Sequence, residues 1–249
     1  MRALLVEDDL TTARGIGLIL KSIGAVMDEA DTGEEAVELT RHYDYDVLIV
    51  DLMLPDMEGY EVVRRVRAAR NNVPILILSG LSRTQARVKA LAMGADDFVT
   101  KPYDKDELIA RLRAVVRRSR GFSQPELSVG PLRIKQDSRE VKVGETEVHL
   151  TGKEYAILEV LVLRKGSVLS KEAFLSHLYG GMDEPETKII DVFICKLRKK
   201  LAQAGADNLI STVWGRGYMM RDVPPSVPLV APTSFREPAL PASGYPVLA

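Results

Sequence analysis

Five side chains that could perform phosphoryl chemistry each follow a short apolar run in the first half of the sequence: Glu7, Asp8, Asp51, Ser79 and Lys101. Clustered carboxylates repel one another unless a hard cation lies among them, and Mg²⁺ prefers a few such oxygen ligands. A carboxylate beside Mg²⁺ and a lysine is suited to accept a phosphoryl group, because both cations stabilise the transferring charge. These residues therefore predict a phosphoacceptor site, provided that the fold brings them together.

The elements expected to position these residues alternate regularly along the chain. Apolar runs predict strands at residues 2–6, 26–29, 47–50, 73–78 and 97–100. Helical patterns lie between and after them, at residues 9–23, 33–42, 58–70, 83–93 and 104–118. Five βα units of this spacing predict an α/β fold with a doubly wound, five-stranded parallel sheet. Because parallel strands end at the same edge, the side chains that follow them should meet there.

The chain as a whole divides into four zones. We expect a domain at 1–118, a linker at 119–125, a second, α+β domain at 126–222 and a tail at 223–249. The second domain combines alternating strand patterns with helical patterns at residues 152–164, 171–178 and 186–203 and a glycine-containing hairpin at 210–220. Residues 223–249 hold seven of the 13 prolines and almost no charge. This composition predicts a disordered tail.

The helix expected at 186–203 has two different faces. Ile190, Ile194, Leu197 and Leu201 form a narrow stripe that should face the core. The opposite face carries lysines beside exposed apolar side chains, which would be unfavourable toward water alone. The hairpin that follows is rich in aromatic and basic residues. This combination favours a nucleic-acid contact over a merely solvated face.

Overall composition excludes several other classes. The net charge is −1, with 34 basic and 35 acidic residues, so bulk charge does not identify a DNA-binding protein. No apolar run reaches the roughly 18 residues that a membrane helix needs. The single cysteine, Cys195, cannot form an internal disulfide, and a cytoplasmic location is expected. His42, His149 and His177 lack metal-ligand spacing and are expected at surface or boundary positions.

Residues 1–118 resemble a two-component receiver domain. The matching motifs are Leu5-Val6-Glu7-Asp8-Asp9, Asp51-Leu52-Met53-Leu54-Pro55-Asp56 with Gly59, Ser79-Gly80 and Lys101-Pro102. The resemblance implies that Asp51 is the phosphoacceptor, that Lys101 pairs with the phosphoryl oxygens, and that Ser79 and Phe98 form a switch. It also implies Mg²⁺ held by Glu7, Asp8, Asp51 and the Met53 carbonyl. The phosphoryl donor would be a histidine kinase or a histidine phosphotransferase.

In the subfamily resembled here, the face formed by the helix at 83–93, the strand at 97–100 and the helix at 104–118 makes a symmetric homodimer. The resemblance implies three ion pairs across this interface: Arg87 with Glu107, Asp97 with Arg111, and Asp96 with Arg118. A two-fold interface must be self-complementary, and this set of charges can be.

The second zone resembles the winged helix-turn-helix domain of OmpR/PhoB-type regulators. The motifs are Leu150-Thr151-Gly152-Lys153-Glu154-Tyr155, Leu197-Arg198-Lys199-Lys200-Leu201 and Thr212-Val213-Trp214-Gly215-Arg216-Gly217-Tyr218. The resemblance implies a recognition helix in the major groove of double-stranded DNA and a wing near the minor groove. The implied DNA contacts are Lys188, Ile189, Val192, Lys196, Arg198, Lys199, Thr212, Trp214 and Arg216.

Several of these residues carry a more specific expectation. Lys188 and Lys196 are expected at bases or phosphates, and Arg198, Lys199 and Thr212 at phosphates, which position the protein rather than specify a sequence. Apolar Ile189 and Val192 suit thymine methyl groups, so A/T-rich sites are expected.

The block from Tyr179 to Leu201 is closer still to the alphaproteobacterial cell-cycle regulators within this family. That resemblance implies paired A/T-rich half-sites, activation or repression of transcription, and RNA polymerase as a further partner.

Two other readings remain open on the residues alone. Asp51 could be the transient nucleophile of a phosphatase, although such enzymes usually keep a second acid two residues on, where Met53 stands here. Alternatively, the second domain could bind protein instead of DNA. A binding constant that falls with salt would mark phosphate contacts and so distinguish binding of DNA from binding of protein. On balance, a phosphoacceptor that is not an enzyme is expected.

Overall fold

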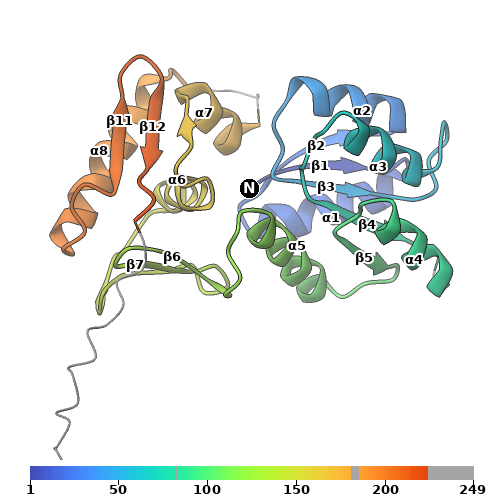
Figure 1. Ribbon diagram of the computed structural model, residues 1–249, viewed down its shortest axis with the longest axis horizontal. Helices are drawn as coiled ribbons and strands as arrows, with labels where there is room; N and C mark the ends of the chain where they lie inside the picture. The colour runs from blue at the N-terminus through green and yellow to red at the C-terminus, as the bar shows by residue number, and fades with distance from the viewer. Residues whose placement is uncertain (82, 181–184, 224–249) are drawn as a thin grey trace, which may run out of the picture.

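The computed structural model describes residues 1–81, 83–180 and 185–223 (Figure 1). The stretch expected to be a disordered tail lies outside the described residues from residue 224 onward.

A five-stranded parallel sheet forms the centre of the N-terminal part. Its strands follow the order β2-β1-β3-β4-β5, and they are β1 (Arg2–Val6), β2 (Val26–Ala30), β3 (Val47–Val50), β4 (Ile75–Ser79) and β5 (Asp97–Thr100). Every residue of β1, β3 and β4 is buried, as a central parallel strand requires when helices cover both faces of its sheet.

Five helices cover this sheet: α1 (Leu10–Ser22), α2 (Gly33–His42), α3 (Gly59–Ala68), α4 (Thr84–Ala92) and α5 (Lys105–Ser119). Side chains alternate between the two faces of each strand. Ala3 and Leu5 of β1 therefore pack in one apolar cluster with α1 and α5, while Leu4 and Val6 pack in a second cluster with α2 and α3. The predicted doubly wound fold is confirmed.

The C-terminal part begins with a four-stranded antiparallel sheet of β6 (Glu126–Val129), β7 (Leu132–Lys135), β8 (Glu140–Val143) and β9 (Thr146–Glu147). Three helices follow, α6 (Gly152–Leu163), α7 (Lys171–Tyr179) and α8 (Lys188–Gln203). A second sheet, of order β10-β12-β11, consists of β10 (Val168–Leu169), β11 (Ile210–Val213) and β12 (Gly217–Met220). This is the expected α+β winged-helix arrangement.

Local sequence explains where helices of this part begin. Thr151 accepts a hydrogen bond from the backbone N–H of Glu154, while the Glu154 carboxylate accepts one from the backbone N–H of Thr151. This capping box satisfies two donors that the first turn of α6 would otherwise leave unpaired. Ser170 caps α7 in a similar way, through the N–H of Ala173.

The two parts contact each other through the edge of the parallel sheet where β1 and β3 begin. Helix α7 packs against β2, and one apolar cluster continues from α1 and α5 into α6. Figure 1 shows α6 and α7 between the parallel sheet and α8, which lies on the far side of the C-terminal part.

Candidate functional site

The acidic pocket lies at the edge of the sheet where the parallel strands end. Glu7 follows β1, Asp51 follows β3, and Lys101 follows β5. The Lys101 amine donates to Glu7 Oε2 at 2.6 Å and to the Asp51 carboxylate. Glu7 and Asp51 are each only 7% exposed. The fold thus brings one cation and two buried anions together, as the sequence predicts for these three residues.

Burial makes the charges of this pocket interdependent. Loss of water raises the pKa of Glu7, and the hydrogen bond and charge of Lys101 only partly oppose that effect. Burial also disfavours the Lys101 cation, but its contacts with Asp51 and Glu7 outweigh burial and raise its pKa. Lys101 therefore stays charged, yet one lysine leaves the pair of carboxylates with excess negative charge.

The loop after β3 holds Asp51 in place. The backbone N–H of Met53 donates to Asp51 Oδ1 at 3.0 Å, and Met53 pairs with Glu58 in an isolated β-bridge. A Cβ at Gly59 would lie 2.0 Å from the main-chain oxygen of Asp51. Only glycine allows α3 to begin this close to the pocket.

The fit of this pocket to Mg²⁺ rests on the chemistry of its donors. Carboxylates and the Met53 main-chain carbonyl are hard oxygen ligands of the kind that Mg²⁺ prefers. Asp8 lies at the same strand end but is exposed, and within the described ranges no three acidic, histidine or cysteine side chains converge as a metal-binding group. The donor types fit Mg²⁺, and the excess negative charge calls for a second cation.

The two expected switch residues are buried on neighbouring strands. Ser79 is at the end of β4, and its Oγ accepts the backbone N–H of Leu81 at 3.2 Å. Phe98 in β5 is buried, with the Arg87 guanidinium 5.7 Å from its ring centre. Movement of the Phe98 ring would therefore require the Arg87 side chain of α4 to shift as well.

The charged residues expected to pair across a dimer make contacts within the single chain. Arg111 bonds Asp97 at 3.0 Å and Glu107 at 2.8 Å. Asp96 is bonded by Arg67 and by the backbone N–H of Ile75. The remaining two, Arg87 and Arg118, are exposed.

Helix α8 presents the face that the sequence predicts. Ile190, Ile194, Leu197 and Leu201 are buried, which confirms the core stripe. The opposite face exposes Lys188, Val192, Cys195, Lys196 and Lys199, while Ile189 is partly buried. An apolar Val192 that is 45% exposed among lysines remains suited to a partner that offers both phosphates and methyl groups.

Two of the expected phosphate contacts are bonded to each other. Arg198 donates to the main-chain oxygen of Ile210 at 3.1 Å and to Thr212 Oγ1 at 2.8 Å. These bonds join α8 to β11. The wing tip beyond them is open, with Trp214 90% exposed and Arg216 exposed beside it.

No sequence pattern indicates the buried polar cluster that lies where the two parts meet. Asp46, only 2% exposed, accepts the backbone N–H of Arg2 at 2.9 Å. Arg164 of the C-terminal part donates to it at 2.9 Å, and His177 Nδ1 lies 3.3 Å away. Arg120, just after α5, lies 3.5 Å from the same carboxylate. The expectation that His177 is a surface or boundary residue is therefore wrong, because the docking of α7 buries its ring.

Neighbouring positive groups hold the Asp46 carboxylate ionised. Burial alone would raise the pKa of the Asp46 carboxyl, but its contacts with His177 and Arg164 hold that pKa well below its usual range. Burial lowers the pKa of the His177 imidazole. The Met1 amino nitrogen lies 2.9 Å from His177 Nε2, so the neutral ring accepts there and donates from Nδ1 to Asp46.

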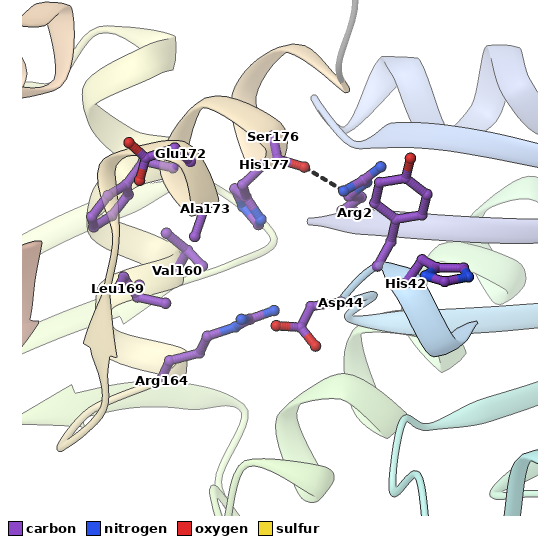
Figure 2. Close-up of a pocket in the computed structure, with 12 residues that line it drawn as sticks. Arg2, His42, Asp44, Val160, Arg164, Leu169, Glu172, Ala173, Ser176 and His177 are labelled. Carbon is purple, nitrogen blue, oxygen red and sulfur yellow. Dashed lines mark hydrogen bonds between the residues drawn. The ribbon is translucent and has the colours of Figure 1, made fainter. Parts of the chain in front are cut away.

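Figure 2 shows the cleft beside this cluster, in which Arg2 and Ser176 form a hydrogen bond between the two parts. The cavity has a volume of about 410 Å³ and is lined by residues from both parts. Arg2 also bonds Asp28 at 2.6 Å, so its guanidinium is already neutralised from within the N-terminal part.

Comparison with known proteins agrees with both folds. Residues 3–113 match the response regulator receiver domain family, and residues 145–220 match the family described as transcriptional regulatory protein, C terminal. The chain therefore belongs to the OmpR/PhoB-type response regulators, which combine a receiver with a DNA-binding domain.

Its relatives include cell-cycle regulators named CtrA. The cell cycle transcriptional regulator CtrA of Caulobacter vibrioides is 57% identical over 223 residues, covering 89% of this chain and 96% of that protein. The cell cycle response regulator CtrA of Brucella anthropi is 56% identical over the same shares. The response regulator DrrB of Thermotoga maritima, an OmpR/PhoB homologue of known structure, is 28% identical with a TM-score of 0.43, covering 88% of this chain and 98% of that one.

The helices within the described ranges are all too short or too polar to cross a membrane.

Proposed function

We propose that this cell-cycle-type response regulator accepts a phosphoryl group at Asp51 and, as a dimer, binds paired A/T-rich half-sites to activate or repress transcription. The observation that carries the proposal is the Lys101 amine between two buried carboxylates at the carboxyl edge of the sheet. With Mg²⁺ added, such a site would supply the positive charge that an incoming phosphoryl group requires.

Phosphoryl transfer follows from the roles of the pocket residues. An Asp51 carboxylate oxygen would form the new P–O bond as the P–N bond of a phosphohistidine donor breaks and the imidazole leaves. Lys101 would move from the carboxylates toward the phosphoryl oxygens. Asp8, Asp51 and the Met53 carbonyl would hold Mg²⁺ directly, with Glu7 reaching it through water. When bound, Mg²⁺ supplies positive charge at the transferring group.

The donor would be a histidine kinase or a histidine phosphotransferase. The protein would then act as a phosphoacceptor in the cytoplasm and not as a classical enzyme, with slow self-dephosphorylation as its only turnover.

The phosphoryl group would act on the dimer face through Ser79 and Phe98. It adds up to two negative charges and three acceptor oxygens. Ser79 would exchange its contact with the Leu81 N–H for a phosphoryl oxygen, and Phe98 would repack beneath Arg87. In the dimer, Asp97 and Arg111 would exchange their bond within the chain for one across the two-fold axis, with the Arg87–Glu107 and Asp96–Arg118 pairs beside it.

On DNA, α8 would lie in the major groove. Lys188 and Lys196 would contact bases or phosphates, and Ile189 and Val192 would meet thymine methyl groups. Arg198, Lys199 and Thr212 would hold phosphates, while Trp214 and Arg216 would reach the minor groove from the wing. The exposed basic face of α8 and the open wing tip support this arrangement. RNA polymerase would be the further partner at promoters, where the protein would be associated with the nucleoid.

The test is selection of bound duplexes from a random pool, with and without a phosphoryl mimic, for the unmutated chain and Asp51→Asn. We expect paired A/T-rich half-sites, tighter binding with the mimic, and no effect of the mimic on Asp51→Asn. Binding that shows no sequence preference and no dependence on salt would contradict the proposal.

A further inference from the structure

Asp191 is the one acidic residue of α8, and both of its carboxylate oxygens have partners within the protein. Tyr218 of β12 donates its hydroxyl to Asp191 Oδ1 at 2.6 Å. Lys171, at the start of α7, donates to Asp191 Oδ2 at 2.7 Å. A free carboxylate on a helix face near DNA would repel the phosphates. Here Lys171 neutralises the Asp191 carboxylate, which connects α8 to both α7 and β12.

Tyr218 lies where the wing, α7 and α8 meet. In the sheet it pairs with Thr212 of β11 and Leu169 of β10. Its ring centre is 6.4 Å from that of Phe174 in α7 and 5.6 Å from the Arg198 guanidinium of α8. Burial and the hydrogen bond to Asp191 raise the pKa of its hydroxyl to about 12, so it remains a donor at physiological pH.

Two ties therefore connect α8 to the wing at different heights along the helix. The first joins Asp191 to Tyr218, one turn from Lys188 and next to Val192. The second joins Arg198, about two turns further on, to Ile210 and Thr212. A single tie would allow the hairpin to pivot against the helix, whereas two ties define the angle between them.

We propose that Asp191 and Tyr218 are positioning residues that set the spacing between the recognition helix and the wing, so that both can engage one DNA site at the same time. The inference rests on the DNA-binding function proposed above. Asp191 accordingly does not read a base, because both of its oxygens are occupied inside the protein. Its contribution to affinity is made through the wing contacts of Trp214 and Arg216.

The experiment is a double-mutant cycle on the full chain, with a duplex obtained by the selection described above. Tyr218→Phe removes the hydroxyl and keeps the ring that packs on Phe174. We expect it to weaken DNA binding about tenfold, the scale of one hydrogen bond to a charged group. In a background where Trp214 and Arg216 are both changed to alanine, the same change should lower DNA affinity about twofold or less. The wing then lacks the DNA contacts that its position would affect.

Tyr155→Phe is the matched control. Tyr155 is also buried in the C-terminal part, where its hydroxyl bonds the Glu159 carboxylate and the Arg139 guanidinium lies 4.5 Å from its ring centre, and neither partner belongs to α8 or the wing. It should leave DNA affinity unchanged. If Tyr218→Phe costs the same in both backgrounds, the hydroxyl serves only general stability and the inference is wrong.

Footprinting separates positioning from base reading. Asp191→Ala should remove protection where the wing contacts DNA while leaving the preferred base pairs unchanged, and Asp191→Asn, which keeps an acceptor for Tyr218, should restore part of that protection. A relaxed preference at one base pair would instead show that Asp191 reads a base.

The outcome for the unmutated chain distinguishes failure of the DNA-binding function from failure of the positioning role. If it selects no duplex, the proposed DNA-binding function fails. If it binds and footprints normally while Tyr218→Phe changes neither its affinity nor its wing footprint, the positioning inference alone fails.

Discussion

Lys101 is the residue on which the charge balance of the pocket depends. It is the cation that contacts both Glu7 and Asp51, and both carboxylates are buried. Without it, two adjacent anions would share a site from which water is largely excluded, which is far more costly than the same repulsion at the surface.

We expect Lys101→Ala to lower the free energy of unfolding by about 3–5 kcal/mol at neutral pH, the usual cost of leaving a buried charge unpaired. Mg²⁺ should recover part of this loss, because it would replace the missing positive charge. Denaturant unfolding with and without Mg²⁺ measures both effects. Lys135→Ala, which removes an exposed partner of Glu140, serves as the control and should change little. A Lys101→Ala protein as stable as the unmutated one would show that the carboxylates are not held as charged groups.

At this scale the sequence predicts pocket residues well, since each follows an apolar run and parallel strands end at one edge. It predicts side-chain pairing poorly. The sequence predicts phosphate contacts for both Arg198 and Thr212, whereas their mutual hydrogen bond depends on how β11 packs beside α8. No spacing within the sequence indicates that contact.

The turn between β3 and α3 shows how an element limits the site that it supports. Helix α3 begins at Gly59, whose backbone passes directly over the main chain of Asp51. Gly15 offers a contrast, because it lies inside α1 with no atom within 4 Å of a Cβ built there.

Gly59→Ala and Gly15→Ala should therefore change stability in opposite directions. The first forces the backbone near Asp51 to shift and should cost about 1–3 kcal/mol, as overpacking does. The second should stabilise α1 by about 0.5–1 kcal/mol, because alanine is the better helix former. Thermal unfolding of both variants checks the signs, and the rate of phosphoryl uptake should fall for Gly59→Ala only. Equal effects would mean that the loop after β3 can relax freely.

For the whole molecule, the important feature is that the two parts dock through the sheet edge opposite the acidic pocket. Asp46 accepts hydrogen bonds from Arg164 and His177 there, while α8 stays on the far side (Figure 1). The docked arrangement covers neither the acidic pocket nor the face of α8 that we propose to contact DNA. This interface could not be predicted, because it pairs residues more than a hundred positions apart with no periodic pattern to mark them.

We expect Asp46→Ala to weaken docking strongly, because it leaves the partly buried Arg164 and the buried His177 without their anionic partner. The cost should be about 3–5 kcal/mol. Faster proteolysis within residues 120–125, between α5 and β6, and a larger radius of gyration would report the separation. Asp137→Ala is the control. The Asp137 side chain is 88% exposed, so its ion pair with Arg113 should contribute little to docking. Unchanged proteolysis of Asp46→Ala would contradict the assigned role.

Docking should also depend on pH through His177. Burial lowers the pKa of the docked imidazole, so in the undocked chain, where the pKa is about 6.5, the ring binds protons more readily. Docking is then at full strength above that pH and weakens as the pH falls through it. Asp46 stays ionised over this window, because its pKa is well below the usual range. Linker proteolysis between about pH 7.5 and about pH 5.5 tests this in comparison with His177→Gln, whose profile should be flatter. Identical profiles would exclude His177 as the source.

The buried Asp46 cluster bears on the use of this chain in protein engineering. A chimeric sensor would join the receiver of one protein to the DNA-binding domain of another, on the assumption that the two domains do not contact each other. Here a chimera joined within residues 119–125 would leave Arg164 and His177 facing whichever residue the new receiver has in place of Asp46. A functional chimera would therefore need Arg2 and Asp46 introduced into the new receiver. Alternatively, those two residues, Arg164 and His177 would all have to be replaced together.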